Sequence, residues 1–329
     1  VKSVNEDYEY SGESLNTLFA KRSNIFRVGF LRMLYEMYKF GKEADASGAG
    51  LDSAITLGQY LKSKNYSDEF IHYFITPMGA AIWSTPANKV LDMPAYFFIK
   101  FFYNHGMLEI VNRPKWWVIK NGSSRYIKKI IKGFENKIHL SSPIVKVSRS
   151  KEGVEIFLSN HNETLKFDAV IFATHSDQAL KLLDRPTELE SEILQAFPYQ
   201  KNDVMLHTDS SVLPTRKLAW ASWNYQLDRD PSAPVVLTYN MNILQSIKAN
   251  ETFCVTLNDF NSVDQNKVIK KITYHHPLFT VDSIKAQKRK HEISGINNTY
   301  YCGAYWRNGF HEDGVVSALD VCEQFGEVL

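Results

Sequence analysis

The chain has 329 residues, of which 44% are hydrophobic and 22% charged, and its formal net charge is +2. This length exceeds one compact core of ordinary size, so we expect two domains, and the composition excludes a disordered chain. The small net charge gives no global field that would favour nucleic acid as a partner. No window approaches the ~20 uncharged apolar residues of a membrane span, so we expect a soluble protein or one in peripheral contact with a membrane.

The cysteines Cys254, Cys302 and Cys322 have no CxxC spacing, and their odd number leaves at least one thiol unpaired. This pattern indicates neither a disulfide scaffold nor a metal site, and it fits a reducing cytoplasm. Basic side chains cluster at three places, which are residues 128–132, 267–271 and 285–291. Each run has helix-like surroundings, so we interpret all three as solvated helix faces.

The N-terminal part of the chain predicts one strand and several helices. Residues 1–10 alternate like a strand already in progress, so we expect the natural chain to start earlier. Apolar residues recur at helical spacing over 24–44, and a Gly/Ser-rich loop follows at 47–50. Thr56 and Ser67 each offer a hydroxyl that can accept an amide of a first helical turn, which predicts two helix starts.

An aromatic helix is predicted next. Pro86 suits a helix start, and a long aromatic run extends from there to His105. These rings either fill a buried core or line a pocket for an apolar substrate. Residues 116–120 resemble a strand, and 124–134 return to helical periodicity.

The remaining chain is rich in predicted strands. A β-meander and an apolar strand are expected first, at 138–147, 154–158, 165–167 and 169–173. Helices follow at 178–183 and 188–196. A second sheet is expected from runs at 204–207, 218–222, 235–239 and 253–257. The chain closes with a short strand at 299–303 and a helix over 314–325.

The most informative segment is 300–326, in which a strand, a glycine turn, a polar loop and a helix follow one another. Gly303, Gly309 and Gly314 let the backbone approach a ligand, and a helix starting near Asp313 directs free N–H groups toward it. Such a unit can bind an anionic group. A glycine-rich turn also occurs as an ordinary connection between a strand and a helix that binds no ligand, and spacing alone leaves both interpretations open.

The segment resembles the C-terminal FAD-binding motif of the flavin-containing amine oxidase superfamily, in its bacterial branch of predicted NAD/FAD-binding proteins. The motif residues are CGAYW at 302–306 and GFHEDG at 309–314. Further matches to that branch are SGESLNTLFAKR (11–22), PMGAAIWS (77–84), FFYNHGML (101–108), FDAVIFATHSDQAL (167–180), PYQKNDVMLHTD (198–209), AWASWNY (219–225) and YHHPLFT (274–280). The matches cover the chain from end to end.

This resemblance implies an α/β fold with two discontinuous parts. An incomplete FAD/NAD(P)-binding Rossmann-like domain is expected from 120–183 and 297–329. An amine-oxidase-like substrate domain is expected from 1–119, mainly helical, and 184–296, a sheet with helices. The family opens with a strand, a GxGxxG turn and a helix, and Gly48-Ala49-Gly50 is no substitute for that turn. We therefore expect a truncated N-terminus and weak or absent FAD retention.

The resemblance also assigns the cofactor site. It implies that Ala173 and Thr174 face the dinucleotide and that Val145 meets its adenine side. It implies further that the following loop and helix start approach the pyrophosphate and the flavin, through Gly303, Ala304, Gly309, His311, Glu312, Asp313 and Gly314.

The implied activity is FAD-dependent oxidation, in which a hydride passes from the substrate to flavin N5 and no catalytic base is obligatory. The expected substrate is fatty-acyl or otherwise apolar. Candidate pocket walls are Trp83, Trp220, Trp223, Tyr225 and Trp306, although ordinary core packing explains any single one of them better. The alternative is a non-catalytic binding or interaction module that keeps the fold.

Overall fold

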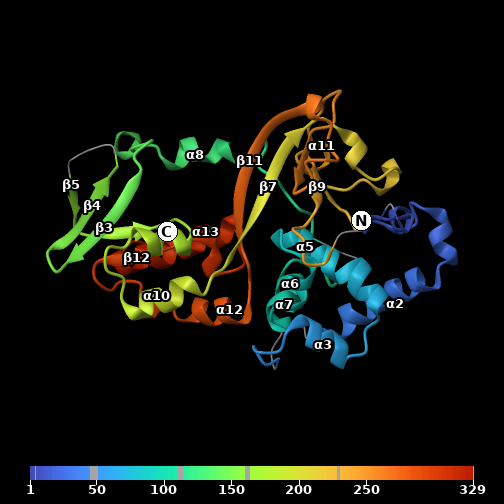
Figure 1. Cartoon of the computed structure of the whole chain (residues 1–329), viewed down its shortest axis with the longest axis horizontal. Helices are drawn as coiled ribbons and strands as arrows, with labels where there is room; N and C mark the ends of the chain where they lie inside the picture. The colour runs from blue at the N-terminus through green and yellow to red at the C-terminus, as the bar shows by residue number, and fades with distance from the viewer. Residues whose placement is uncertain (4, 45–50, 110–113, 160–163, 228–229, 329) are drawn as a thin grey trace. The chain divides into compact units, whose positions relative to one another are not determined.

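The computed structural model describes residues 1–3, 5–44, 51–109, 114–159, 164–227 and 230–328. It is a mixed α/β protein, as predicted, with two compact units that are each discontinuous in sequence (Figure 1). Unit 1 comprises Val1–Lys129 and Gln200–His276, and unit 2 comprises Ile130–Tyr199 and Pro277–Leu329. The domain limits expected from the sequence describe functional parts, and they stay a prediction.

Unit 1 contains a five-stranded sheet in the order β11-β7-β10-β9-β8. Its strands are β7 (Tyr199–His207), β8 (Trp223–Tyr225), β9 (Leu237–Asn240), β10 (Cys254–Leu257) and β11 (Val268–Pro277). The pairs β7–β10, β10–β9 and β9–β8 are antiparallel. A buried chain of hydrogen bonds crosses the middle strands, because Thr256 Oγ1 lies 2.8 Å from both His207 Nε2 and Thr238 Oγ1.

Unit 1 contains several helices, two of which begin at predicted caps. They are α1 (Leu15–Leu18), α2 (Val28–Glu43), α3 (Leu57–Ser63), α4 (Asp68–Phe70), α5 (Thr76–Trp83), α6 (Ala87–Leu91), α7 (Ala95–Asn104), α8 (Ser124–Ile130, which ends at the start of unit 2) and α11 (Met241–Leu244). The Thr56 hydroxyl accepts from the Gln59 amide at 3.3 Å, and the Ser67 hydroxyl from the Phe70 amide at 3.2 Å. Both predicted helix starts are confirmed.

Several predicted elements of unit 1 are wrong. The stretch from Pro86 to His105 forms two helices, because Pro94 lacks an N–H and restricts the residue before it. The four phenylalanines of α7 are buried in the core whereas Tyr103 is exposed, and the ring centroids of Phe98 and Phe102 stack at 4.1 Å. Residues 116–119 form no strand.

Three further corrections concern strands. Residues 1–10 form a hairpin of β1 (Lys2–Ser3) and β2 (Tyr8–Glu9) in place of one strand. Residues 218–222 form no strand, because Trp220 Nε1 donates to Pro214 O at 2.7 Å and holds a 3-10 turn. The basic run at 267–271 does not lie on an α-helix, because Lys267 ends a 3-10 turn and the other residues belong to β11. The Gly/Ser-rich loop at 47–50 lies outside the described residues.

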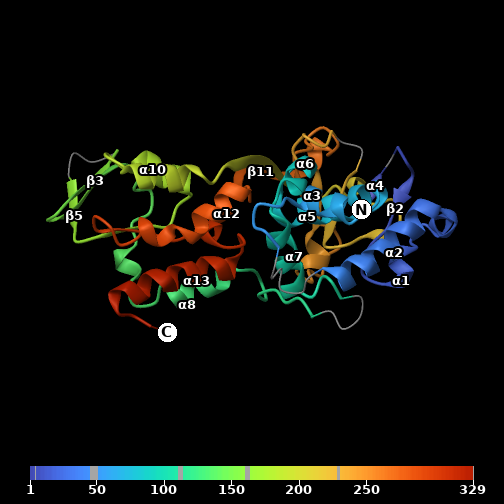
Figure 2. The ribbon, with the colours of Figure 1, turned by 90° about the horizontal axis from the view of Figure 1, so that it is seen from below.

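Unit 2 contains two small sheets. The predicted meander is confirmed as the antiparallel sheet β3-β4-β5, and β6 pairs in parallel with β12. The strands are β3 (Ile144–Ser150), β4 (Gly153–Leu158), β5 (Thr164–Phe167), β6 (Val170–Phe172) and β12 (Thr299–Tyr301). The helices are α9 (Ser176–Leu182), α10 (Glu188–Gln195), α12 (Val281–Lys288) and α13 (His311–Cys322). In Figure 2, α10, α12 and α13 lie at successive levels of this unit.

A buried ion pair joins the elements of unit 2. Both guanidinium nitrogens of Arg149, on β3, bond the Glu190 carboxylate of α10, which is 2% exposed. The Tyr301 hydroxyl of β12 donates to the same carboxylate at 2.7 Å. One buried acid therefore fixes three elements that are distant in sequence.

Candidate functional site

The ends of two parallel strands meet in unit 2. Val170 lies opposite Thr299 and Phe172 opposite Tyr301, and the ladder continues because the Cys302 amide donates to Phe172 O at 2.9 Å. The segments that follow β6 and β12 therefore leave the sheet at the same edge. In open α/β sheets, ligands bind at the carboxyl ends of parallel strands.

Ala173 and Thr174 are the residues that follow β6, and both are exposed. They stand beside the Cys302–Gly303 turn that follows β12, as the strand register requires. The sequence predicted that these two segments, about 130 positions apart, would come together. The strand pairing bears out this adjacency, while their contact with a dinucleotide stays a prediction.

The loop after β12 depends on glycine. Gly303 has φ +151°, and a Cβ at this position would lie 2.6 Å from the Tyr305 ring. Its amide donates to Ser317 Oγ of α13 at 3.0 Å. Gly309 has φ +97° and packs against the Phe279 ring, and its amide donates to Ala304 O at 3.1 Å. The loop therefore folds back onto the helix that follows it.

The start of α13 combines a closed cap with open space. The Asp313 carboxylate turns back toward the chain before the helix, where Oδ2 accepts from the Phe310 amide at 3.0 Å. His311 and Glu312 are exposed. A Cβ added to Gly314 would meet nothing within 4 Å, so a planar group can approach the first turn there. The first amides of a helix lack intrahelical acceptors and carry partial positive charge.

Sequence reasoning missed a cation beside this loop. Lys290 Nζ donates to the Ser317 backbone oxygen at 3.2 Å, contacts Ser317 Oγ at 3.4 Å, and lies 3.4 Å from Asp320 Oδ2. Its side chain is only 13% exposed. The residue falls inside the basic run 285–291, so the sequence pattern indicated a solvated face. Lys290 instead orients the serine that holds the Gly303 turn.

Val145 lies on β3, where the register shifts between Ile144 and Lys146. Such a bulge turns a side chain out of the regular ladder, and Val145 is 54% exposed. Its predicted contact with adenine stays a prediction.

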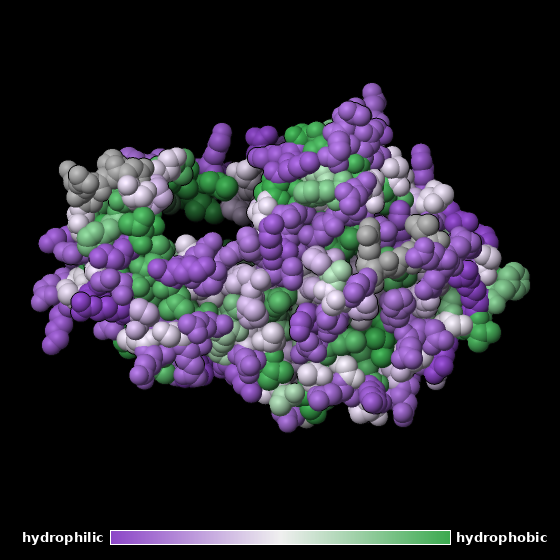
Figure 3. All heavy atoms as spheres, viewed as in Figure 1, coloured by the Kyte–Doolittle hydropathy of each residue, from purple (hydrophilic) through white to green (hydrophobic). Residues whose placement is uncertain are grey.

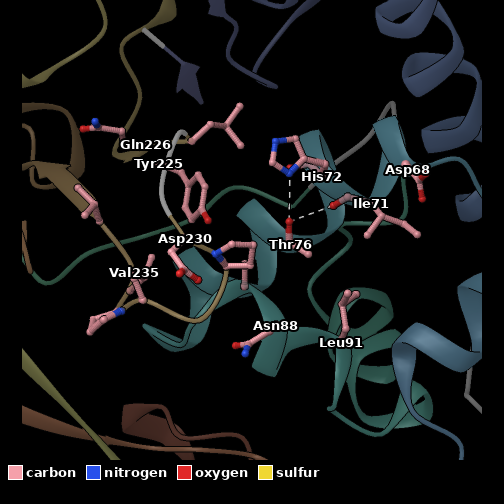
Figure 4. Close-up of a pocket in the computed structure, with 16 residues that line it drawn as sticks. Asp68, Ile71, His72, Thr76, Asn88, Leu91, Tyr225, Gln226, Asp230 and Val235 are labelled. Carbon is pink, nitrogen blue, oxygen red and sulfur yellow. Dashed lines mark hydrogen bonds between the residues drawn. The ribbon is translucent and has the colours of Figure 1, made fainter. Parts of the chain in front are cut away.

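Unit 1 has its own cavity, of about 260 Å³ (Figure 4). A π-helical turn, Ile71–Ile75, forms one wall, and the displaced Ile71 carbonyl accepts from Thr76 Oγ1 at 3.0 Å. Turns of this kind occur often at functional sites. Tyr225 of β8 lies on the opposite side, and burial raises its pKa to about 12, so its phenol stays neutral. The lining has more aliphatic than polar residues, and the polar and charged ones besides Tyr225 are Asp68, His72, Thr76, Asn88, Gln226 and Asp230.

Four of the five predicted pocket walls lie in unit 1 and one in unit 2, and ring contacts through Phe101, His105 and Trp116 link Trp83 to Trp223. Tyr225 lines the cavity of unit 1, whereas Trp83 is buried against the Phe101 ring at 4.9 Å. Trp220 and Trp223 lie elsewhere in unit 1, and Trp223 meets the Trp116 ring edge-on at 6.1 Å. Trp306 belongs to unit 2, is 5% exposed, and packs on the Phe197 ring at 5.0 Å. Substrate contact by the four tryptophans stays a prediction.

The described residues contain no group of three or more His, Cys, Asp or Glu side chains suited to a metal ion. Within the same ranges, no helix is long and apolar enough to cross a membrane.

The family model for flavin-containing amine oxidoreductases matches residues 7–238, more than two thirds of the chain. The chain belongs to this family. Membership makes it an FAD-dependent oxidoreductase, which confirms the resemblance seen in the sequence. No curated protein matches the chain.

Three solved structures illustrate the fold of this oxidoreductase. The CLA-producing fatty acid isomerase from P. acnes has a TM-score of 0.64 and 14% identity, and the match covers 91% of this chain and 75% of that one. Cyclohexylamine oxidase from Brevibacterium oxydans IH-35A has a TM-score of 0.56 and 11% identity, with 90% and 75% covered. Putrescine oxidase bound to putrescine has a TM-score of 0.58 and 11% identity, with 97% and 78% covered.

The edge of unit 2 fits the FAD that this family carries. A glycine-dependent turn, exposed residues after β6 and open space beside Gly314 leave room for a flat, anionic cofactor. Asp313 presents no free carboxylate there, because its two oxygens are directed at Phe310 N and at Asn308 Nδ2, 3.3 Å away.

Proposed function

We propose that this oxidoreductase oxidises an apolar substrate, with a fatty-acyl compound as the substrate class. The observation that carries the proposal is the pairing of β6 with β12. It brings the segment at Thr174 and the Gly303 turn to one edge of the sheet, where the Gly303 amide donates to Ser317 of α13. FAD, when bound, supplies a hydride acceptor at N5.

The protein's own part is to bind and orient. The Gly303 turn, held by Ser317, presents backbone without a side chain in the way. The first turn of α13 favours negative charge next to it, and its Asp313 carboxylate is occupied by the cap. Ordered N–H groups stabilise added charge without reorganisation, so this helix start favours the two-electron reduced state.

Two observations support an apolar substrate. The cavity of unit 1 has more aliphatic than polar residues in its lining, which also includes Tyr225, His72 and the acids Asp68 and Asp230. A fatty acid isomerase is among the proteins with this fold. Amines form the second candidate class, because cyclohexylamine and putrescine oxidases share the fold. We infer a cytoplasmic location from three cysteines that form no disulfide, with burial raising the pKa of Cys254 to about 12.

The test of the cofactor site compares two glycines. Gly314→Ala places a methyl group in the open space beside α13, and Gly12→Ala does so in an equally open loop of unit 1. We expect the first change to weaken FAD affinity at least about tenfold and the second to leave it unchanged. The melting temperature of the Gly314→Ala variant should not fall, because alanine suits a helix interior better than glycine. Equal FAD affinity in both variants would refute the site.

The cofactor grip and the substrate class are tested separately. The sequence has no GxGxxG turn, so we expect FAD to dissociate from the 329-residue chain during gel filtration while equilibrium titration still detects binding. With excess FAD under anaerobic conditions, a fatty acid should bleach the flavin absorbance and an alkylamine should not. If the amine alone bleaches the flavin, the substrate class is amines and not fatty-acyl compounds. If the chain binds neither FAD nor reduced FAD, the alternative hypothesis of a non-catalytic binding or interaction module is supported.

A further inference from the structure

Two long polar side chains near the end of α12 contact the loop 302–310, which joins β12 to α13. Gln287 lies in the last turn of α12, and Lys290 begins the 3-10 turn Lys290–Glu292 that follows. Both belong to unit 2, as does the loop. Each donates hydrogen bonds to backbone oxygens of the loop or of α13, so the α12 region holds this part of the chain from outside.

Gln287 supports the middle of the loop. Its Nε2 donates to Tyr305 O at 2.8 Å and to Arg307 O at 2.6 Å. These carbonyls lie at the end of the 3-10 turn Ala304–Trp306, and the last carbonyls of a helical turn lack partners within the turn. One side-chain amide therefore supplies the donors that the backbone of the turn cannot provide.

Lys290 supports the start of the loop through Ser317 of α13. Its ammonium donates to Ser317 O at 3.2 Å and contacts Ser317 Oγ at 3.4 Å. The same hydroxyl oxygen accepts from the Gly303 amide at 3.0 Å. Burial raises the pKa of the Cys302 thiol, and the positive charge of Lys290 counters part of this rise. Lys290 therefore acts on the first residues of the loop.

The burial of Lys290 distinguishes it from an ordinary surface lysine. Hydrophilic side chains cover much of the molecular face seen in Figure 3, and Lys285 of α12 follows that pattern, with 59% of its side chain exposed. The Lys290 side chain is 13% exposed, whereas its ion-pair partner Asp320 is half exposed. Ordering a lysine side chain costs rotamer entropy, which the contacts with Ser317 offset.

The loop needs support from outside because two of its residues are glycines at positive φ. Gly303 has φ +151° and Gly309 has φ +97°. Glycine loses more backbone freedom on folding than any other residue, so this loop is costly to order. When protein contacts order a loop before the ligand arrives, the ligand has less entropy to offset, and it binds more tightly.

We propose that Gln287 and Lys290 are positioning residues for FAD, which hold the loop 302–310 in the conformation that receives the cofactor. The inference rests on the proposed function, because it takes the edge formed by β6 and β12 as the FAD site. Both side chains act through backbone oxygens of the loop and of α13. Loss of either support therefore weakens FAD binding by raising the entropy cost of ordering the loop.

The experiment compares matched substitutions in equilibrium FAD titrations of the whole chain. Gln287→Leu removes both hydrogen bonds to the loop, and Lys290→Met removes the ammonium while keeping most of the side-chain length. Each change should raise the dissociation constant of FAD about tenfold. Lys290→Arg keeps a cationic donor and should bind FAD within about threefold of the parent chain. The control is Lys285→Met, which alters an exposed lysine paired with Asp282 and should bind FAD like the parent chain.

Amide hydrogen exchange of the FAD-free variants separates positioning of the loop from general stability. In Gln287→Leu and Lys290→Met, exchange at 302–310 should accelerate at least about threefold, while exchange at 144–158 in the sheet of β3 and β4 should match the parent chain. Acceleration throughout unit 2 together with a lower melting temperature would overturn the proposal, because the two residues would then support the whole unit.

The titration of the parent chain distinguishes the two ways of failing. If the parent chain binds FAD and both variants bind it equally well, the positioning role is overturned and the proposed function stands. If the parent chain binds no FAD, the proposed function fails and the positioning role fails with it.

Discussion

Gly303 and Gly314 flank the candidate site, and they differ in whether the backbone at that position requires glycine. Gly303 has a positive φ and sits against the Tyr305 ring, so only glycine fits. Gly314 lies within α13 with open space beside it. A glycine inside a helix costs stability relative to alanine, and an added Cβ at Gly314 would meet nothing within 4 Å.

Gly303→Ala is expected to lower the free energy of unfolding by about 2 kcal/mol or more, because the new methyl group meets both the positive φ and the Tyr305 ring. Urea denaturation measures this loss. Gly314→Ala is the comparison and should match or exceed the parent stability by about 0.5–1 kcal/mol. A neutral Gly303→Ala change would contradict the described turn.

At the scale of elements, the Glu190 carboxylate joins α10 to β3 and β12. Burial raises the pKa of Glu190, but hydrogen bonds from Arg149, the Thr187 amide and Tyr301 outweigh it and hold the pKa below its usual range. The acid therefore stays ionised and paired in the core of unit 2. A buried pair of this kind resists the loss of either partner.

Glu190→Gln should destabilise the protein by about 3–5 kcal/mol, because the guanidinium of Arg149 is left buried beside a neutral amide. Thermal and urea unfolding give the measurement. Glu192→Gln on the same helix is the matched control, since Glu192 pairs with Arg289 at the surface, and we expect a much smaller loss of stability. Similar losses in the two variants would show that burial of the pair contributes nothing.

Asp209, at the end of β7, predicts a pH dependence. Burial raises its pKa, but the Asp264 amide, Ser211 and Lys267 outweigh burial and lower the pKa to about 2. A carboxyl with a depressed folded pKa stabilises the fold above its unfolded pKa, near 3.8, and loses that contribution as the pH falls toward 2. Asp209→Asn should therefore cost about 2 kcal/mol at neutral pH and converge with the parent protein near pH 2. Unfolding midpoints across this range are the measurement, and a constant gap would contradict the assignment.

At the scale of the whole molecule, each unit is assembled from two separate stretches of chain. The edge assigned to FAD is built entirely within unit 2, from β6, β12 and α13. The described cavity with Tyr225 is built entirely within unit 1. Ligand binding at the strand edge of unit 2 and ligand binding in the cavity of unit 1 can therefore be measured separately.

FAD should stabilise the protein by about 2.7 kcal/mol when its free concentration is one hundred times its dissociation constant. When FAD is added, amide hydrogen exchange measured by mass spectrometry should slow most at residues 170–174 and 299–314 of unit 2. Riboflavin lacks the phosphates and the adenosine and serves as the control, with weaker protection. Protection confined to unit 1 would contradict the location of the site.

The sequence by itself determined the family, the α/β class and the elements with strong local signals. Thr56 and Ser67 cap helices through bonds to amides three residues ahead, so these starts were predictable. The 299–322 segment was recognisable as strand, turn and helix because an apolar run, glycines and helical spacing follow one another there. A local prediction failed where proline or a side-chain bond intervened, as at Pro94 and Trp220.

Only the tertiary structure decided which distant groups meet. The pairing of Phe172 with Tyr301 and the burial of Lys290 beside Ser317 depend on contacts across many residues. The same is true of the apolar stripe left uncovered on α2. Hydrophobic periodicity marks a face as apolar, but the packing of the other elements decides whether that face is covered.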